Sequence, residues 1–368
     1  MKIEAAVTRA KSAPLSLETI ELEAPRMDEI LVKLEATGIC HTDIAMRDQA
    51  YPVPQPIVLG HEGAGIVAAI GNAVTKVKPG DRVVMTFNSC GRCSSCTDHA
   101  PTYCYEFFGY NFAGSRPDGS SPLSKDGQPI HGNFFGQSSF ASHALCHERN
   151  VVKVPDDVPL ELLGPLACGI QTGAGGVINS LKIGMGQTLA VFGAGSVGLS
   201  AIMAARLVGA ATIIAVDLID ARLQLATELG ATHIVNGGSA DAVEEIRRIT
   251  GGAGTDFTFE STGVISVLRQ AIDALAPRGT CGFVGASPAG SEVAVNVTDI
   301  MTAGRRIQGI VEGDSNPDLF IPRMIEFYKQ GRFPFDKLIS FYPFERINDA
   351  IRDSESGKTV KPVVRFSQ

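Results

Sequence analysis

Hydrophobic and polar positions alternate in short segments along the first half of the chain. Examples are Ile30-Leu31-Val32-Lys33-Leu34, Gly65-Ile66-Val67-Ala68-Ala69-Ile70-Gly71 and Arg82-Val83-Val84-Met85. A two-residue period between proline and glycine turn signals is typical of strands with one exposed face. No helical period dominates before about residue 160. The pattern therefore predicts a β-rich first domain, which we assign to residues 1–169.

The pattern changes in the second half, where apolar runs of strand length alternate with helical segments. In chain order these are Thr188–Phe192, Leu199–Leu207, Ala211–Val216, Ala221–Leu229, Ala231–Val235, Val243–Ile249, Phe257–Glu260, Val264–Leu275 and Thr280–Gly285. Strands that alternate with helices imply a parallel, doubly wound sheet. The predicted fold class is α/β, with a Rossmann domain at 170–309. Residues 310–368 are predicted to fold back onto the first domain.

The composition is that of an ordinary globular protein. The 368 residues are 44% hydrophobic and 19% charged, and the formal net charge is −7. A mildly acidic chain lacks the basic footprint of a nucleic-acid-binding protein. No window approaches the roughly 18 consecutive apolar residues of a membrane span, and the N-terminus shows no secretory signal. We expect a cytoplasmic protein with no nucleic-acid or membrane partner.

Four of the eight cysteines lie close together, at Cys90, Cys93, Cys96 and Cys104. Thiolates two residues apart can bind one tetrahedral cation, and four thiolates form a closed zinc site. An iron–sulfur centre also uses tight cysteine runs, but with a different fourth ligand and a trailing proline. A redox C-x-x-C pair would not need four cysteines. The spacing predicts a structural zinc that supplies folding energy to this loop.

A glycine-rich turn, Gly193-Ala194-Gly195-Ser196-Val197-Gly198, follows the first strand of the second half. Alone this G-x-G-x-x-G is a weak signal, but a strand precedes it and a helix follows. The glycines let a pyrophosphate approach the free N–H groups at the helix N-terminus. Gly193, Gly195, Val197 and Gly198 are therefore predicted cofactor-binding residues.

Asp217 ends the next predicted strand. An acid about 20 residues after the glycine turn accepts hydrogen bonds from the adenosine ribose hydroxyls. Its charge repels a 2′-phosphate, so we predict NAD rather than NADP. The alternative is that Asp217 is only an acidic residue in a surface turn.

The segment Gly60-His61-Glu62-Gly63-Ala64-Gly65 puts a metal-ligand side chain next to a carboxylate. We hypothesise that His61 binds a catalytic zinc together with Cys40 and Cys168, because three such ligands leave one coordination position open. Taken singly, a cysteine is more often a small buried apolar residue than a ligand. An isolated histidine is likewise usually a polar residue with a structural partner.

These motifs resemble the zinc-dependent medium-chain alcohol dehydrogenase family over essentially the whole chain. Gly60–Gly65 matches the family motif G-H-E-x-x-G, while Phe135–Phe140 and Leu162–Gly173 are similar to bacterial aryl (benzyl) alcohol dehydrogenases and their geraniol-oxidising relatives. The resemblance implies a GroES-like catalytic domain with both zinc sites, so two Zn²⁺ per chain, and a Rossmann domain that binds NAD. It also implies a small alcohol or aldehyde substrate and a homo-oligomer, either a dimer or a tetramer.

The resemblance also implies roles for single residues. Cys40, His61 and Cys168 would bind the catalytic zinc. Thr42 would take the proton of the alcohol, Asp43 would orient the His61 ring, and Glu62 would lie behind the metal and assist ligand exchange. The further expected cofactor contacts are His41 and Lys361 at the pyrophosphate and Thr172 beside the nicotinamide.

One position departs from the family pattern. Many members pass the proton on to a histidine five residues after the first cysteine ligand, and here that residue is Ala45. Proton release is therefore expected to use water or another group. Tyr51, Phe87 and Phe134 are either walls for an aromatic substrate or plain core residues. Residues 109–133, which are rich in Gly, Ser, Pro and Asp, are predicted to be a long loop or an insertion.

We therefore expect an NAD-dependent aryl-alcohol dehydrogenase that oxidises a primary aromatic or allylic alcohol to its aldehyde by hydride transfer. A geraniol dehydrogenase, or a polyol or formaldehyde/glutathione-type dehydrogenase, is the alternative within the superfamily. A zinc-free, NADPH-dependent quinone reductase would not need Cys40, His61 and Cys168. A non-catalytic NAD-binding regulator would keep the four-cysteine site but would have no use for an open zinc position.

Overall fold

The computed structural model describes residues 1–366, whose contacts divide the chain into two units. Unit 1 comprises Met1–Cys168, Asn316–Ile325 and Asp336–Gln368, and unit 2 comprises Gly169–Ser315 and Glu326–Phe335. The functional domain boundaries at residues 169 and 309 stay predictions.

Unit 1 is built on two sheets. The five-stranded sheet is antiparallel and has the order β4-β1-β2-β7-β8. Its strands are β1 (Lys2–Thr8), β2 (Ser16–Leu22), β4 (Ile57–Val58), β7 (Leu123–Lys125) and β8 (Gln128–Ile130). The β7–β8 hairpin lies inside residues 109–133, so of the two predictions for this segment the long loop does not hold at the hairpin, and an insertion remains.

The seven-stranded sheet has the order β10-β6-β5-β3-β18-β17, and β9 also pairs with β3. Its strands are β3 (Glu29–Gly38), β5 (Gly63–Ile70), β6 (Arg82–Met85), β9 (His143–His147), β10 (Val151–Lys153), β17 (Ile339–Pro343) and β18 (Lys361–Arg365). Through the antiparallel pairing of β18 with β3, the C-terminal segment extends the sheet that carries the first part of the chain.

Helices of unit 1 are short and connect the strands. They are α1 (His41–Arg47), α2 (Ser94–Thr97), α3 (Phe107–Phe112) and α11 (Ile347–Glu355). Helix α10 (Pro317–Lys329) contributes residues to both units. A cluster of buried aromatic and aliphatic side chains, including Phe134, Phe135 and Phe140, forms the core between α1, α3 and the five-stranded sheet.

Unit 2 is a six-stranded, wholly parallel sheet with the order β13-β12-β11-β14-β15-β16. Its strands are β11 (Thr188–Phe192), β12 (Thr212–Asp217), β13 (His233–Asn236), β14 (Thr255–Glu260), β15 (Leu275–Phe283) and β16 (Arg306–Gly309). If these six strands are renumbered from 1 to 6 along the chain, their order in the sheet is 3-2-1-4-5-6. This is the strand order of the dinucleotide-binding doubly wound fold. The predicted α/β fold class is confirmed.

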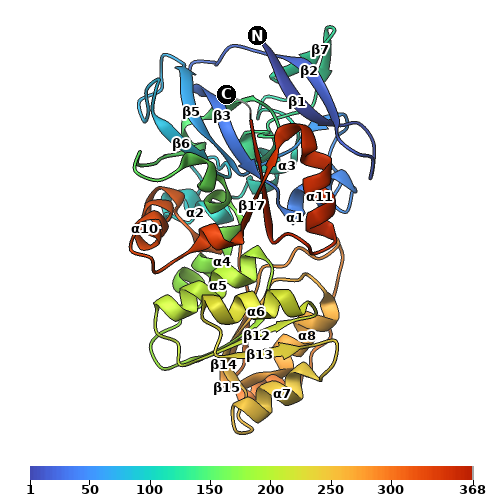
Figure 1. Ribbon diagram of the computed structural model, residues 1–368, viewed down its shortest axis with the longest axis vertical. Helices are drawn as coiled ribbons and strands as arrows, with labels where there is room; N and C mark the ends of the chain where they lie inside the picture. The colour runs from blue at the N-terminus through green and yellow to red at the C-terminus, as the bar shows by residue number, and fades with distance from the viewer. Residues whose placement is uncertain (367–368) are drawn as a thin grey trace. The chain divides into compact units, whose positions relative to one another are not determined.

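Helices cover both faces of the parallel sheet (Figure 1). The helices of unit 2 are α4 (Gly169–Gly175), α5 (Ser196–Leu207), α6 (Asp220–Leu229), α7 (Ala242–Ile249), α8 (Ile265–Asp273) and α9 (Val297–Ala303). Helices α5 and α6 lie on one face, and α7 and α8 on the other (Figure 1). Ile246 and Leu268, from α7 and α8, pack with Phe192 and Val216 of the sheet, so the strands are buried as parallel strands require.

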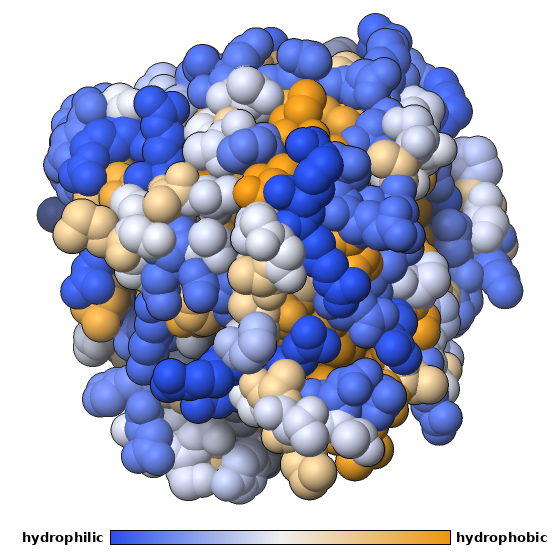
Figure 2. Space-filling view, turned by 90° about the horizontal axis from the view of Figure 1, so that it is seen from below, coloured by the Kyte–Doolittle hydropathy of each residue, from blue (hydrophilic) through white to orange (hydrophobic). Residues whose placement is uncertain are grey.

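Polar residues dominate the face in Figure 2, where hydrophobic residues are exposed only in narrow strips. Within residues 1–366, no helix combines the length and the apolar character that crossing a membrane requires.

Candidate metal and dinucleotide sites

Cys40 is presented by the turn that joins β3 to α1. It is the N-cap residue of α1, with extended backbone, and its N–H donates to Asp43 Oδ2 at 3.0 Å. This is a capping arrangement that fixes the start of the helix. The thiol lies 3.8 Å from the hydroxyl of Thr42 in the first turn. His41 is exposed at the same helix start.

His61 is fully buried, and its ring orientation is fixed by Asp43. Nδ1 of His61 lies 2.8 Å from Asp43 Oδ1, which also accepts the Gly60 N–H at 3.0 Å. Gly60 has φ +92, and an added Cβ would lie 2.5 Å from the backbone nitrogen of Phe140, so no larger residue fits before the histidine. The carboxylate favours the tautomer with the proton on Nδ1, which leaves the Nε2 lone pair available.

No described residue makes a hydrogen bond of ordinary geometry to His61 Nε2, although this nitrogen is buried. A buried nitrogen without such a bond is costly unless another group, such as a metal, satisfies it. Phe135 stacks on the imidazole with ring centroids 4.5 Å apart, and Phe134 meets it edge-on at 5.7 Å. The rings keep water from the histidine on these sides.

The structure brings Cys40, His61, Glu62 and Cys168 together. One ligand atom from each lies within 4.8 Å of the others. Hydrogen bonding to Cys168 is the main reason that the pKa of the Cys40 thiol lies well below its ordinary value, with further contributions from His61 and Lys361. A thiolate is the form of cysteine that binds zinc. Two sulfurs and one imidazole nitrogen are a donor set that fits zinc.

Glu62 and Lys361 form a buried ion pair beside these ligands. Both side chains are at most 1% exposed, and Lys361 Nζ donates to Glu62 Oε1 at 2.9 Å and Oε2 at 3.0 Å. A third bond of 3.2 Å joins the ammonium to the Ile39 carbonyl. Burial raises the pKa of Glu62, and the adjacent ammonium opposes that shift. The ammonium is thus engaged by Glu62 here, and its role at the pyrophosphate stays a prediction.

The substrate-wall candidates are largely core residues. Phe134 is fully buried and Phe87 is 4% exposed, both in the main core cluster of unit 1, and Tyr51 packs against that cluster. Ala45 is also partly buried against this cluster.

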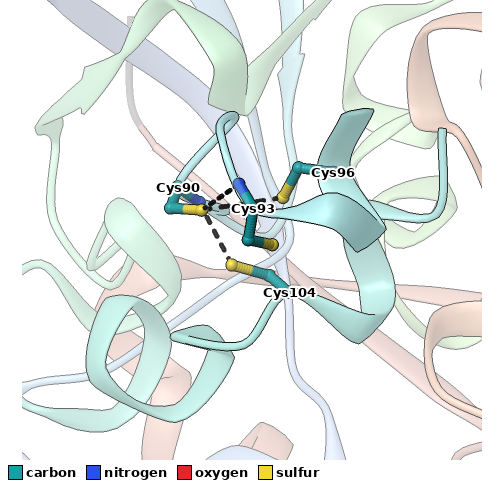
Figure 3. Close-up of side chains that lie close together, drawn as sticks. All are labelled: Cys90, Cys93, Cys96 and Cys104. Atoms are coloured by element: carbon teal, nitrogen blue, oxygen red, sulfur yellow. Dashed lines mark hydrogen bonds between the residues drawn. The ribbon is translucent and has the colours of Figure 1, made fainter. Parts of the chain in front are cut away.

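The second group of candidate ligands contains only cysteines. The side chains of Cys90, Cys93, Cys96 and Cys104 converge on a common space (Figure 3), with their sulfurs within 4.8 Å of one another. The Cys90 and Cys96 sulfurs are 3.9 Å apart, and the Cys93 N–H donates to Cys90 Sγ at 3.3 Å. A backbone hydrogen bond at Tyr105 is the main cause that lowers the pKa of Cys93 to about 6. Four sulfurs leave no open ligand position, as in structural zinc sites.

The glycine turn joins β11 to α5 in unit 2. An added Cβ at Gly198 would lie 1.7 Å from the Gly193 carbonyl oxygen, so only glycine permits this packing of helix against turn. At Gly195 an added Cβ would meet no described atom within 4 Å, which leaves open space at the N-terminus of α5. Val197 lies in the first turn of α5. Open space over free helix N–H groups fits a pyrophosphate.

Asp217, at the end of β12, holds the glycine turn in place. Its Oδ2 accepts the Ala194 N–H at 2.6 Å, while Oδ1 accepts the N–H groups of Leu218 and Ile219 at 2.8 and 2.9 Å. A carboxylate has further lone pairs, so these bonds still leave acceptor capacity for ribose hydroxyls. Asp217 is therefore a structural part of the turn, not an isolated surface acid.

Sequence reasoning assigned no role to Glu312, which lies in unit 2 close to Thr172. Glu312 Oε2 is 3.2 Å from Gln171 Nε2 and 3.5 Å from Thr172 Oγ1. Its backbone is left-handed, with φ +49. The only signal in the sequence was an acid in an otherwise apolar segment.

Comparisons with known proteins agree with this geometry. The model of the alcohol dehydrogenase GroES-like domain matches residues 26–156, and that of the zinc-binding dehydrogenase family matches residues 196–330. Geraniol dehydrogenase from Castellaniella defragrans is 47% identical over 99% of this chain and 97% of its own length.

Two solved structures are similar over 100% of both chains. The benzyl alcohol dehydrogenase of Acinetobacter calcoaceticus has 48% identity and a TM-score of 0.97. An alcohol dehydrogenase zinc-binding domain protein from Burkholderia ambifaria has 54% identity and a TM-score of 0.98. The predicted GroES-like and Rossmann architecture is confirmed, and the family implies zinc and NAD or NADP. The chain belongs to the zinc-dependent medium-chain alcohol dehydrogenases.

Proposed function

We propose that this alcohol dehydrogenase oxidises a primary aromatic or allylic alcohol of the benzyl alcohol type to its aldehyde, with NAD⁺ as the hydride acceptor. The observation that carries the proposal is the convergence of Cys40, His61 and Cys168 around the buried His61 Nε2. The names of two relatives, a benzyl alcohol dehydrogenase and a geraniol dehydrogenase, support an aromatic or an allylic substrate. Geraniol-type oxidation is therefore the alternative.

We infer that Cys40, His61 and Cys168 hold a catalytic zinc and leave a coordination position for the substrate oxygen. Zinc bound there supplies a Lewis acid that lowers the pKa of a hydroxyl beside it. The Glu62 carboxylate, which is the fourth group of the cluster, is held in an ion pair with Lys361. Cys90, Cys93, Cys96 and Cys104 would hold a second, structural zinc, so the proposal requires two zinc ions per chain.

The chain's own side chains orient the site and move the proton. Asp43 holds the Nδ1 proton of His61, which keeps Nε2 directed at the metal position. The Thr42 hydroxyl, next to Cys40, accepts the proton that the alcohol loses. Because residue 45 is alanine, we propose that water rather than a histidine receives this proton from Thr42.

Unit 2 would bind the dinucleotide at Gly193, Gly195, Val197 and Gly198, with Asp217 at the adenosine ribose. The Asp217 carboxylate favours NAD over NADP because it repels a 2′-phosphate. His41 and Lys361 at the pyrophosphate and Thr172 beside the nicotinamide stay predictions. So do the cytoplasmic location and the assembly as a dimer or tetramer.

The cluster of Cys40, His61 and Cys168 argues against the two alternative functions that lie outside zinc-dependent alcohol oxidation. A zinc-free quinone reductase has no need of Cys40, His61 and Cys168, and a non-catalytic NAD-binding regulator has no need of an open metal position. A polyol or formaldehyde/glutathione-type dehydrogenase would share all these features, so only its substrate distinguishes it from the proposed enzyme.

The test is an alcohol panel with the zinc-loaded protein and either NAD⁺ or NADP⁺. Benzyl alcohol, cinnamyl alcohol and geraniol are compared with ethanol, a polyol and S-hydroxymethylglutathione. We expect kcat/KM to be highest for an aromatic or allylic alcohol with NAD⁺. A preference for ethanol, a polyol or the glutathione adduct would refute the substrate class, and no turnover of any alcohol would refute the proposed function.

A further inference from the structure

Glu312 is a buried acid that has no part in the metal sites or the glycine turn. It lies in the turn after β16, is 8% exposed and has φ +49. A residue with a long side chain rarely adopts left-handed backbone, and strain of this kind at a charged residue is a reason to look for a function.

The carboxylate is held in one orientation by α4. Gln171 Nε2 lies 3.2 Å and Thr172 Oγ1 lies 3.5 Å from the same oxygen, Oε2. The next residue packs equally closely, because an added Cβ at Gly313 would lie 2.3 Å from the Gln171 carbonyl oxygen. Asn179 also donates to the Gly313 carbonyl at 3.1 Å. The Glu312 carboxyl group is therefore held against α4 and is not free to rotate in solvent like that of a surface glutamate.

The topology puts this carboxyl group at the edge of the sheet where a doubly wound fold binds its cofactor. Strand β16 runs parallel to the other five, so the turn after it lies at the same carboxyl edge as the glycine turn and Asp217. In a doubly wound sheet the dinucleotide extends along this edge across the point where the strand order reverses, here between β11 and β14. Asp217 is on the β12 side, with the adenosine, so Glu312 is on the side of the nicotinamide half.

We propose that the Glu312 carboxylate is a positioning residue that sets the relative affinity of the enzyme for oxidised and reduced cofactor. The inference rests on the proposed NAD-dependent function. The oxidised nicotinamide ring carries a positive charge that is lost when it takes up hydride. A fixed negative charge on that side favours the oxidised ring, and burial limits the screening by salt. Glu312 thus assists NAD⁺ binding and the release of NADH.

The experiment measures dissociation constants of NAD⁺ and of NADH separately, by calorimetry on the full-length, zinc-loaded protein. Glu312→Gln removes the charge and keeps the shape. We expect the ratio Kd(NAD⁺)/Kd(NADH) to rise by about tenfold, the effect of one nearby charge in a partly buried site. The matched control is Asp256→Asn, because Asp256 bonds to Thr188 at the start of β11, at the opposite edge of the same sheet. Its ratio should stay at the wild-type value.

A second variant separates charge from packing. Glu312→Asp keeps the charge and loses one methylene, so its ratio should remain near that of the wild type even if both constants rise. If the ratio is unchanged in Glu312→Gln, whether or not the affinities for NAD⁺ and NADH fall together, Glu312 has only a structural role and the inference is overturned. If the wild-type protein binds neither form, the proposed function fails together with it.

Discussion

The buried pair of Glu62 and Lys361 makes a sharp prediction about stability. Replacing Lys361 by methionine keeps most of the length of the side chain but removes the ammonium, which lies 2.9 and 3.0 Å from the two oxygens of a fully buried carboxylate. Removing one partner of a buried pair leaves an uncompensated charge and destabilises by about 3–5 kcal/mol. We expect a loss of this size in the free energy of unfolding of Lys361→Met.

The assay is urea unfolding of the zinc-loaded protein, followed by circular dichroism. Lys358→Met is the matched control, because Lys358 is the same residue type only three positions away but its side chain is 71% exposed, and its bond to Asp353 should contribute little. The double variant Glu62→Gln with Lys361→Met removes both charges of the pair. It should therefore be more stable than Lys361→Met alone, which leaves the Glu62 charge without its partner. Equal stability losses at Lys361 and Lys358, or strictly additive losses in the Glu62–Lys361 cycle, would contradict the reasoning.

Three further predictions concern separate parts of the chain. Cys168→Ser should abolish turnover and lower the zinc content from two ions to one per chain. The control is Cys146→Ser, at a buried cysteine outside both clusters, which should leave the turnover and the zinc content unchanged. Atomic absorption measures the zinc, and NADH formation from the alcohol measures the turnover. Thr42→Val should reduce alcohol oxidation by about 10²-fold or more, as for loss of a proton-transfer group, and a normal rate would show that another group carries the proton. Arg116→Met should lower the free energy of unfolding by about 1.5–3 kcal/mol, the contribution of hydrogen bonds between charged groups, because Arg116 forms two such bonds with Glu29 and anchors the 109–133 segment. A loss below about 0.5 kcal/mol, measured by urea unfolding, would exclude that role.

The parts of the fold with a strong local pattern could be predicted from the sequence. Strand β11 was predicted at its observed bounds, because a buried parallel strand is a continuous apolar run. Helices α5 and α6 were predicted within a few residues of their bounds. The four-cysteine group was recognisable from spacing alone, since its ligands lie within one short loop. Strands β7 and β8 were missed because each has only three residues and no clear alternation.

The residues around the open metal position were harder to predict. Spacing alone does not indicate that Cys40, His61 and Cys168 share one site, so the zinc hypothesis needed the support of the family resemblance. The partnership of Lys361 with Glu62 joins residues 299 positions apart, which no local pattern encodes. In the sequence Glu312 is only an acid in an apolar segment, because its left-handed backbone and its contacts with α4 depend on tertiary packing.

The proposed function requires that two thiolates and one imidazole of unit 1 share a zinc ion that keeps a position open for the alcohol. An anomalous-difference map at the zinc absorption edge, from crystals of the zinc-loaded protein, tests it most directly. We predict one peak among Cys40, His61 and Cys168, and a second among Cys90, Cys93, Cys96 and Cys104. A second peak without the first, at full zinc loading, would contradict the account.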